Sequence, residues 1–373
     1  MDEPHKIVVI LGNGFDLDLG LKTSYKHFWE SDFCPKDYPA PIIKHLNQCW
    51  PGSLDAVKWY DLENELLMYA IKGDKKDVVS AQERNYILSN DDSTLYTRIN
   101  YYGSDDIMSS LVEKGYMKID RGSTYRVTIP YKEDYSMTAQ WRDQKALQHI
   151  KDGLCNYLVS LQYEREAKDT IAYQVLQFLS IEADGKSSVA IYSFNYTDAK
   201  DFVNAAQNAK IQYMHGNCRD GGIIIGTRDD SEFVPSYDFL QKSFDPSFNP
   251  PALVADLQEA DEVIIFGHSI GDNDRQYFKA FFLHQTDFAN TRRKDITIFT
   301  RDEESERQIK RAMESMTDWN LSTLFGLNNL QIIKTCDIKD DQKKLYDFLV
   351  KHGKEDFRTR EFIGKLLCNK SKE

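Results

Sequence analysis

A short apolar segment that ends in two closely spaced glycines limits most strongly what this chain can fold into. Residues 6–11 (KIVVIL) are apolar after the first lysine and mostly β-branched, and Gly12-Asn13-Gly14 follows at once. Such a run is typical of a strand buried in a parallel sheet. Paired glycines after a strand allow a sharp turn and bring backbone N–H groups near a phosphate. We therefore predict the first strand of a nucleotide-binding α/β domain.

Further strand-like runs lie in the second half of the chain, and helical patterns separate several of them. The expected strands span residues 188–192, 212–214, 223–225, 262–266, 296–300 and 331–334. The expected helices span residues 198–209, 273–288 and 302–316. Strands that alternate with helices favour a parallel, doubly wound sheet of the Rossmann-like class.

The interval between the first strand and the others has a different character. Helical patterns at 54–72 and 138–168 flank a polar stretch. We therefore predict a large, mainly helical insertion after the first strand, with a loop-rich or small β middle. The predicted Rossmann-type domain is discontinuous and spans residues 1–25 and 186–336. The insertion spans residues 26–185, and a C-terminal helical segment spans residues 337–373.

Charge, hydropathy and cysteine spacing exclude several classes of protein. The net charge of −12 provides no basic field for a nucleic-acid backbone. No apolar stretch approaches the roughly eighteen residues that a membrane helix needs, and the N-terminal run is unlike a secretory signal. The six cysteines form no C-x-x-C pair, so neither a zinc site nor a disulfide framework is expected. These features predict a cytoplasmic protein without a metal and without membrane or nucleic-acid partners.

The glycine loop does not complete the dinucleotide fingerprint of dehydrogenases. Leu17 stands where the third glycine would be, and no strand ending in an acid follows about twenty residues later. Asp16, Thr23 and Ser24 come after the loop instead. Each of them alone fits a helix cap or a turn, whereas together they fit the mouth of a nucleotide cleft.

Polar residues follow two of the later strands. Asn195 lies in Ser193–Asp198 (SFNYTD), and His215 lies in the pair His215-Gly216. In open α/β sheets, ligands bind beyond the carboxyl ends of the strands. An asparagine there can hold a water or a ribose hydroxyl, and a histidine can accept a proton near neutral pH. Alone, each also fits a structural role in a turn or core.

The segment Gly267-His268-Ser269-Ile270-Gly271 raises a rival interpretation. It matches the G-x-S-x-G nucleophile elbow of α/β-hydrolases. Asp302 and His352 would then complete a catalytic triad with Ser269. However, Asp272-Asn273-Asp274 is a better helix cap, so the helix should begin after the serine. His352 also lies inside a helical pattern, whereas a triad histidine usually lies on a loop. We favour a second glycine loop that holds a ribose or a phosphate.

Taken in order, the motifs of this chain resemble those of the AbiH family of bacterial phage abortive-infection proteins. The matching segments are GNGFDLDLGLKTSY at 12–25, WYDLENEL at 59–66, SFNYTD at 193–198, MHG at 214–216 and FGHSIGDNDRQYF at 266–278. The same order is similar to the wider SIR2-like group. The four-cysteine zinc module of true sirtuins has no counterpart here, which argues against protein deacetylation.

The resemblance implies roles for named residues. Asn195 would hold the nicotinamide-ribose hydroxyls or the attacking water, and His215 would be the base. The first glycine loop would contact the pyrophosphate, and the second loop would contact the adenosine end. The nucleotide-binding candidates are Gly12, Asn13, Gly14, Asp16, Thr23, Ser24, Gly267, His268, Ser269 and Asp274. The chain departs from the SIR2-like motifs at two positions. Asn13 replaces the small middle residue of the glycine loop, and Thr197 separates Tyr196 from the acid Asp198.

The leading functional hypothesis is an NAD+ glycohydrolase-like enzyme of antiviral defence that cleaves the nicotinamide–ribose bond. One alternative is a non-catalytic sensor of NAD or an ADP-ribose-like nucleotide. A second alternative is an α/β-hydrolase that uses Ser269. The expected partners are a small-molecule nucleotide and either a phage-derived trigger or further copies of the chain in a homo-oligomer.

Overall fold

The computed structural model divides into two compact units. It describes residues 4–50, 61–71, 94–95, 118–120, 126–128, 139–161, 169–181, 187–203, 206, 209–220, 222–228, 235–336, 338–352 and 362. The first unit, called the sheet unit below, comprises Met1–Ser24, Leu158–Ile224 and Ser247–Glu373. The second, called the helical unit, comprises Tyr25–Tyr157 and Ile225–Pro246. Each unit is described by itself.

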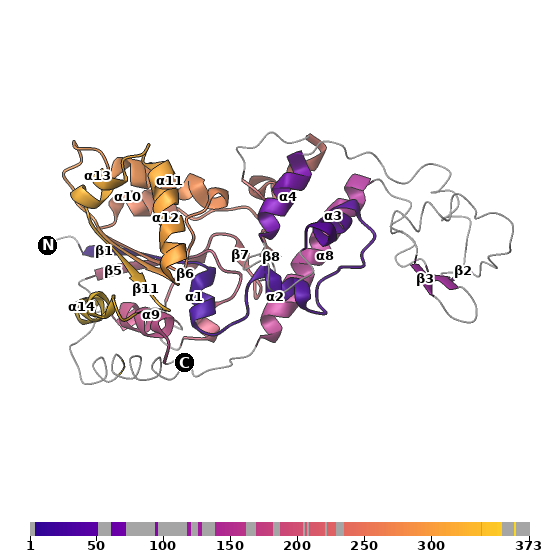
Figure 1. Ribbon diagram of the computed structural model, residues 1–373, viewed down its shortest axis with the longest axis horizontal. Coiled ribbons are helices and arrows are strands. Elements are labelled where there is room, and N and C mark those ends of the chain that lie inside the picture. Colours follow the sequence, from indigo (N-terminus) through magenta and orange to yellow (C-terminus); the bar gives the residue numbers. More distant parts are fainter. Residues whose placement is uncertain are drawn as a thin grey trace. The chain divides into compact units, whose positions relative to one another are not determined.

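The sheet unit is built on six parallel strands in the order β11-β10-β9-β1-β5-β6 (Figure 1). The strands are β1 (His5–Leu11), β5 (Ser187–Ser193), β6 (Ile211–Tyr213), β9 (Glu262–Phe266), β10 (Asp295–Thr300) and β11 (Asn329–Lys334). β1 lies in the middle, and the chain adds strands first on one side of it and then on the other. This is the order of a doubly wound Rossmann-like sheet, as the sequence predicts.

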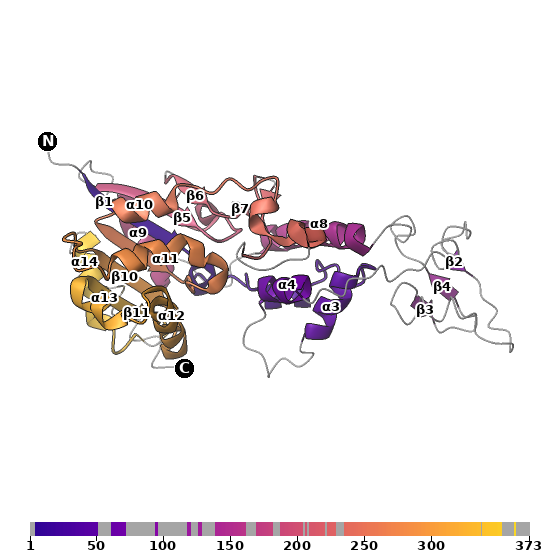
Figure 2. The same ribbon diagram turned by 90° about the horizontal axis from the view of Figure 1, so that it is seen from above.

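Helices cover both faces of the sheet (Figures 1 and 2). The two faces carry two separate hydrophobic clusters. One cluster includes residues of α1 (Asn13–Asp18), α9 (Ile171–Ile181) and α14 (Gln342–His352). The other includes residues of α10 (Leu253–Glu259), α11 (Arg275–His284), α12 (Glu303–Met316) and α13 (Leu321–Leu327).

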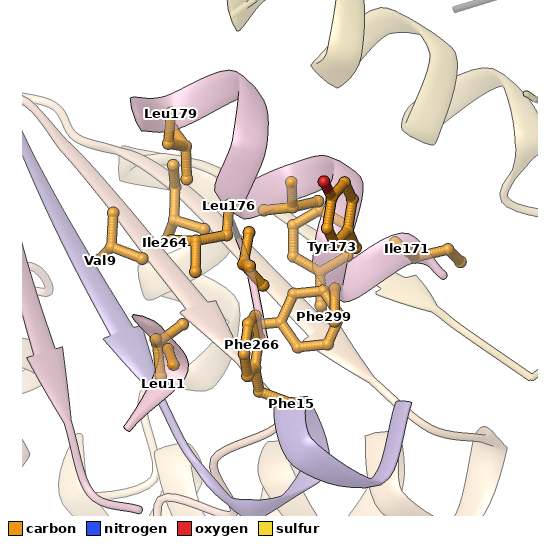
Figure 3. Packing of buried hydrophobic residues seen from close by; sticks show 14 of the residues in the cluster. Val9, Leu11, Phe15, Ile171, Tyr173, Leu176, Leu179, Ile264, Phe266 and Phe299 are labelled. Carbon is orange, nitrogen blue, oxygen red and sulfur yellow. The ribbon is translucent and has the colours of Figure 1, made fainter. Parts of the chain in front are cut away.

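Successive residues of the central strands supply both faces, because side chains alternate along a strand. Val9 and Leu11 pack with α9, whereas Val8 and Ile10 pack with α10 and α11. Figure 3 shows the first cluster, in which Phe266 and Phe299 lie beside Phe15. The continuous apolar runs in the sequence are therefore explained by burial on both sides.

The structure differs from the sequence-based expectations at three places. Residues 223–225 do not form a parallel strand, because β8 (Gly222–Ile223) pairs antiparallel with β7 (Gly216–Asn217) in a separate ladder. The helix expected over 198–209 is a short 3-10 turn at Ala199–Asp201, and four of those positions lie outside the described residues. α9 packs on β1, so it belongs with the sheet rather than with an insertion spanning 26–185.

The helical unit contains the part of the predicted insertion up to Tyr157, together with Ile225–Pro246. Its elements are α2 (Tyr25–Glu30), α3 (Pro41–Cys49), α4 (Leu62–Ile71), β2 (Thr94–Leu95), β3 (Lys118–Asp120), β4 (Arg126–Thr128), α8 (Ala139–Ser160), η4 (Pro235–Leu240) and η5 (Lys242–Phe244). The buried carboxylate of Asp143 on α8 accepts hydrogen bonds from Ile42 N, Tyr69 Oη and Tyr237 Oη. It thereby ties α3, α4, α8 and η4 together. Across the described residues, we find no helix that is long and apolar enough to span a membrane.

Candidate functional site

The two glycine loops meet at the point where the order of strand addition reverses. β1 lies between β5, the next strand of the sheet along the chain, and β9, which begins the second half of the sheet. Ligands of doubly wound sheets bind beyond the strand ends at this switch point. Gly12 N donates to Phe266 O at 2.9 Å, and Gly14 N donates to Gly267 O at 2.8 Å. The first loop is therefore fastened to the second.

The close approach of the loops explains their glycines. A Cβ atom on Gly14 would lie 2.6 Å from Gly267 Cα, and one on Gly12 would lie 2.6 Å from His268 Cα. Gly267 has a φ of 66°, and a Cβ there would lie 2.3 Å from Phe15 N. Because the N–H groups of Gly12 and Gly14 already donate to backbone oxygens, loop packing accounts for both residues without a phosphate. Their contact with a nucleotide stays a prediction.

A buried polar cluster joins the loop after β1 to the segment after β5. Asn195 Nδ2 donates to Asp16 Oδ1 at 2.9 Å and to Gly12 O at 3.0 Å. Thr197 Oγ1 donates to Asp16 Oδ2 at 2.6 Å. All three polar side chains are buried, with exposed fractions of 2% for Asp16 and 6% each for Asn195 and Thr197. Both oxygens of Asp16 therefore have a neutral partner.

The electrostatics of Asp16 follow from this burial. Burial raises the pKa of Asp16 to about 7, although the hydrogen bonds from Thr197 and Asn195 act in the opposite direction. Both hydrogen bonds come from neutral side chains, which explains why desolvation dominates. Asp16 thus changes its charge close to neutral pH, which is a property typical of functional carboxyl groups.

The amide of Asn195 has a defined orientation. Gly12 O can only accept a hydrogen bond, and the ionised Asp16 carboxylate also only accepts, so the NH2 group must face them. Within the described part of the chain, the Oδ1 atom of Asn195 is buried and accepts no hydrogen bond. A buried acceptor without a donor is costly. The arrangement therefore suits a hydroxyl or a water that donates to Oδ1.

A second cluster brings two histidines to one carboxylate. His215 Nε2 lies 3.4 Å from Asp274 Oδ1, and His268 Nε2 lies 3.3 Å from Asp274 Oδ2. His268 Nδ1 accepts a hydrogen bond from Ile270 N, so its Nε2 atom carries the proton that faces Asp274. The Phe194 ring makes edge-on contacts with both imidazoles, with centroids 5.4 Å from His215 and 4.3 Å from His268.

The elements that flank these histidines fix their positions. Phe194 N donates to Leu11 O and Met214 N donates to Ser193 O, which extends the pairing of both strands up to the site. α11 begins at Arg275, as expected from the Asp272–Asp274 segment, but no side-chain cap is formed by Asp274. Its carboxylate faces the histidines instead.

The remaining predicted residues lie around the same edge of the sheet. Thr23 Oγ1 donates to Asn13 Oδ1 at 2.6 Å, so the polar group after α1 folds back on the first loop. Ser24 is buried, and Ser269 is exposed on the second loop. The structure thus brings Asn13 together with Thr23, and Asp16 with Asn195.

The hydrolase interpretation is wrong, because its proposed triad is not assembled. His352 Nε2 lies 3.0 Å from Glu262 Oε1, at the amino end of β9, whereas Ser269 follows the carboxyl end of that strand. Asp302 caps α12 by accepting from Ser305 N. Left-handed backbone falls on Gly267 and Ile270 rather than on Ser269. His352 is therefore not placed to act as the base that Ser269 would need as a nucleophile.

Comparison with known protein families identifies the group to which the chain belongs. The sequence profile described as bacteriophage abortive infection AbiH matches residues 8–296. The chain belongs to the AbiH family. The match confirms the resemblance inferred from the motifs, contains every candidate site residue, and supports a role in abortive infection. No curated protein and no solved structure matches this AbiH protein significantly. Its relation to the SIR2-like group stays a prediction.

The sequence does not reveal how the candidate residues are partnered. Thr197 attracts attention only as a departure from the SIR2-like motif, yet it donates to Asp16 from 181 positions away along the chain. Asp274 resembles a helix cap, yet its carboxylate lies beside His215 and His268. A polar residue directly after a strand can be recognised in the sequence as a candidate site residue. The residue with which it pairs depends on the order of the strands in the sheet, which the sequence does not show.

Proposed function

We propose that this AbiH protein hydrolyses NAD+ at the nicotinamide–ribose bond, through a SIR2-like site at the carboxyl edge of its sheet. The observation that carries the proposal is the Asn195 amide. Its NH2 group is held by Gly12 and Asp16, while its Oδ1 atom is buried and lacks a donor among the described residues. Such an acceptor fits a ribose hydroxyl or the attacking water.

The proposed reaction needs little covalent help from the protein. A bond forms between the water oxygen and the ribose C1′ atom, and the bond between C1′ and the nicotinamide nitrogen breaks. Its electron pair returns to the pyridine ring and neutralises the positive charge there. The transition state resembles an oxocarbenium ion, so positioning of the water and stabilisation of charge supply most of the catalysis.

His215 is the proposed acceptor of the proton that the water loses. Asp274 lies 3.4 Å from its Nε2 atom and would stabilise the imidazolium that forms. His268 holds the other oxygen of Asp274. Asn195 and His215 follow adjacent strands, β5 and β6, which supports their action on one substrate.

The glycine loops would take a different part in nucleotide binding from that of a dehydrogenase loop. The N–H groups of Gly12 and Gly14 donate within the protein. The polar groups proposed for the nucleotide are therefore the side chains of Asn13, Thr23 and Ser269. The proposed partner therefore remains a small-molecule nucleotide. The proposal is also compatible with the cytoplasmic location that the sequence predicts.

Release of nicotinamide from NAD+ by the purified full-length protein tests the proposal, with and without phage lysate as the trigger. We expect turnover by the wild type and its loss in Asn195→Ala and His215→Ala. The matched controls are Asn329→Ala and His284→Ala, both exposed in the sheet unit, which should keep the activity. Calorimetric binding of NAD+ without turnover would favour the sensor alternative, and absence of both binding and turnover would refute the nucleotide site.

A further inference from the structure

We propose that His45, Cys49 and Glu65 form a zinc site that joins α3 to α4 in the helical unit. His45 and Cys49 lie four residues apart on α3, so both side chains occupy one face of that helix. Glu65 lies in the first turn of α4. One ligand atom from each residue falls within 4.8 Å of the other two. The proposal is independent of the nucleotide chemistry of the sheet unit.

The separations of His45 from the other two ligand atoms match those around a tetrahedral metal. Cys49 Sγ lies 3.6 Å from His45 Nε2, and His45 Nε2 lies 3.6 Å from Glu65 Oε2. Bonds of about 2.0 to 2.3 Å at tetrahedral angles separate thiolate, imidazole and carboxylate ligands by roughly 3.4 to 3.6 Å. One zinc ion therefore fits the separations of His45 from Cys49 and from Glu65, and all three ligand atoms lie within 4.8 Å of one another.

Cys49 Sγ lies within hydrogen-bond range of His45 Nε2, but direct pairing of His45 with Glu65 explains their geometry less well. A charge-assisted hydrogen bond between imidazolium and carboxylate has a length of about 2.7 to 2.9 Å, which is well below the 3.6 Å between His45 and Glu65. The two side chains are 14% and 26% exposed, so a solvated surface pair does not describe them either. A shared cation accounts for both the convergence and the separation.

The donor set selects zinc among the common divalent metals. A thiolate, an imidazole and a carboxylate are the three ligand types that zinc accepts together, whereas magnesium and calcium bind oxygen ligands. Three protein ligands leave a fourth position for water. The described residues contain no other group of His, Cys, Asp and Glu with this spacing.

The surroundings of His45 support a defined ligand geometry. The Tyr69 ring packs against the imidazole with centroids 5.2 Å apart. Tyr69 is itself held by a 2.7 Å hydrogen bond from its hydroxyl to Asp143. Residues that orient a ligand from outside the metal shell strengthen binding, because less freedom is lost when the metal enters.

Zinc content and cobalt substitution test the site in the full-length protein. After purification and dialysis, we expect about one zinc per chain. Cobalt in place of zinc should give a thiolate-to-cobalt charge-transfer band in the near ultraviolet. Cys49→Ser should abolish that band and His45→Ala should weaken it. Cys155→Ser, a thiol on α8 of the same unit, should leave it unchanged.

A measurement on the wild type covers the case in which these variants do not fold. Zinc should slow alkylation of Cys49 by iodoacetamide and leave that of Cys155 unchanged, as followed by peptide mass spectrometry. Zinc should also raise the melting temperature of the metal-free protein, because a ligand that binds only the folded state stabilises it. Absence of bound zinc and of the cobalt band in folded wild type, or equal alkylation of Cys49 with and without zinc, would overturn the proposal.

Discussion

Asp16 links the charge state of the candidate site to the stability of the fold. Its carboxylate is buried, accepts from Asn195 and Thr197, and has a pKa raised to about 7. The unfolded chain releases this proton near pH 4. The folded protein therefore loses stability as the pH rises from about 4 to 7, because the ionised form is poorly solvated. Such a cost is typical of residues retained for function.

Replacement of Asp16 by asparagine should remove this cost, because the amide cannot ionise. We expect Asp16→Asn to be more stable than the wild type, and the gain should be about 2 kcal/mol larger at pH 8 than at pH 5. Urea unfolding at the two pH values measures it. Asp272→Asn, which alters an exposed acid, is the control and should show no such dependence. An equal gain at both pH values would contradict the raised pKa.

Asp274 should matter for turnover more than for substrate affinity. It lies beside His215 and His268 but caps no helix, so Asp274→Asn removes charge without breaking α11. If Asp274 stabilises the imidazolium form of His215, kcat should fall about 100- to 10,000-fold with KM little changed. Steady-state release of nicotinamide by this variant and by Asp272→Asn provides the comparison. A rise in KM with an unchanged kcat would assign Asp274 to substrate binding instead.

At the scale of elements, the contact between the two glycine loops holds β1 and β9 in register at the site. Gly14→Ala should destabilise the protein by about 1 to 3 kcal/mol, because the new methyl group would overlap the backbone of Gly267. Gly326→Ala on α13 is the matched control. Nothing lies within 4 Å of its added Cβ, so it should be neutral or stabilise by up to about 1 kcal/mol. Thermal unfolding of both variants distinguishes loop packing from a general intolerance of alanine.

The amino end of β9 is held by an ion-pair cluster of Glu262 with His352 and Lys351. Burial would raise the pKa of Glu262, but hydrogen bonds and charges from His352 and Lys351 outweigh it, and the pKa falls to about 2. The stability from this cluster is present above about pH 4.5 and is lost as the pH falls toward 2. Glu262→Gln should therefore cost about 3 kcal/mol at pH 7 and much less at pH 3, as urea unfolding would measure. A cost independent of pH would show that packing dominates.

For the whole molecule, the class of the sheet follows from local patterns, whereas contacts between distant segments do not. The apolar runs at β1, β9 and β10 are long and bounded by turn residues, so both their existence and their parallel arrangement could be predicted. The strand at 223–225 could not be told from a hairpin, because three apolar residues carry too little periodicity. Asn195 and His215 were proposed as site residues because each follows a predicted strand, and their function stays a prediction.

The zinc candidate escaped the sequence for a related reason. Its ligands have no C-x-x-C spacing, and two of them come from α3 while the third comes from α4. Only the packing of the two helices brings them together. Likewise, the partners Asp16 and Thr197 lie on segments that meet through the pairing of β1 with β5.

Membership of the AbiH family leads to a prediction for the intact cell. Bacteria that express the chain should form fewer phage plaques than bacteria with an empty vector, and Asn195→Ala should abolish that protection. Asn329→Ala, on the far end of the sheet, should protect as the wild type does. Plaque counts with matched expression levels measure this. Full protection by Asn195→Ala would show that the defence role does not depend on the proposed site.

We propose that Asn195 contacts the substrate at the centre of a nucleotide site. A crystal structure of the full-length His215→Ala protein soaked with NAD+ tests it most directly, because this variant should bind the nucleotide and not cleave it. We expect the nicotinamide ribose to lie at the carboxyl edge of β1 and β5, with a ribose hydroxyl or an ordered water donating to Asn195 Oδ1. A nucleotide bound elsewhere on the protein, with Asn195 Oδ1 paired to another protein group, would contradict it.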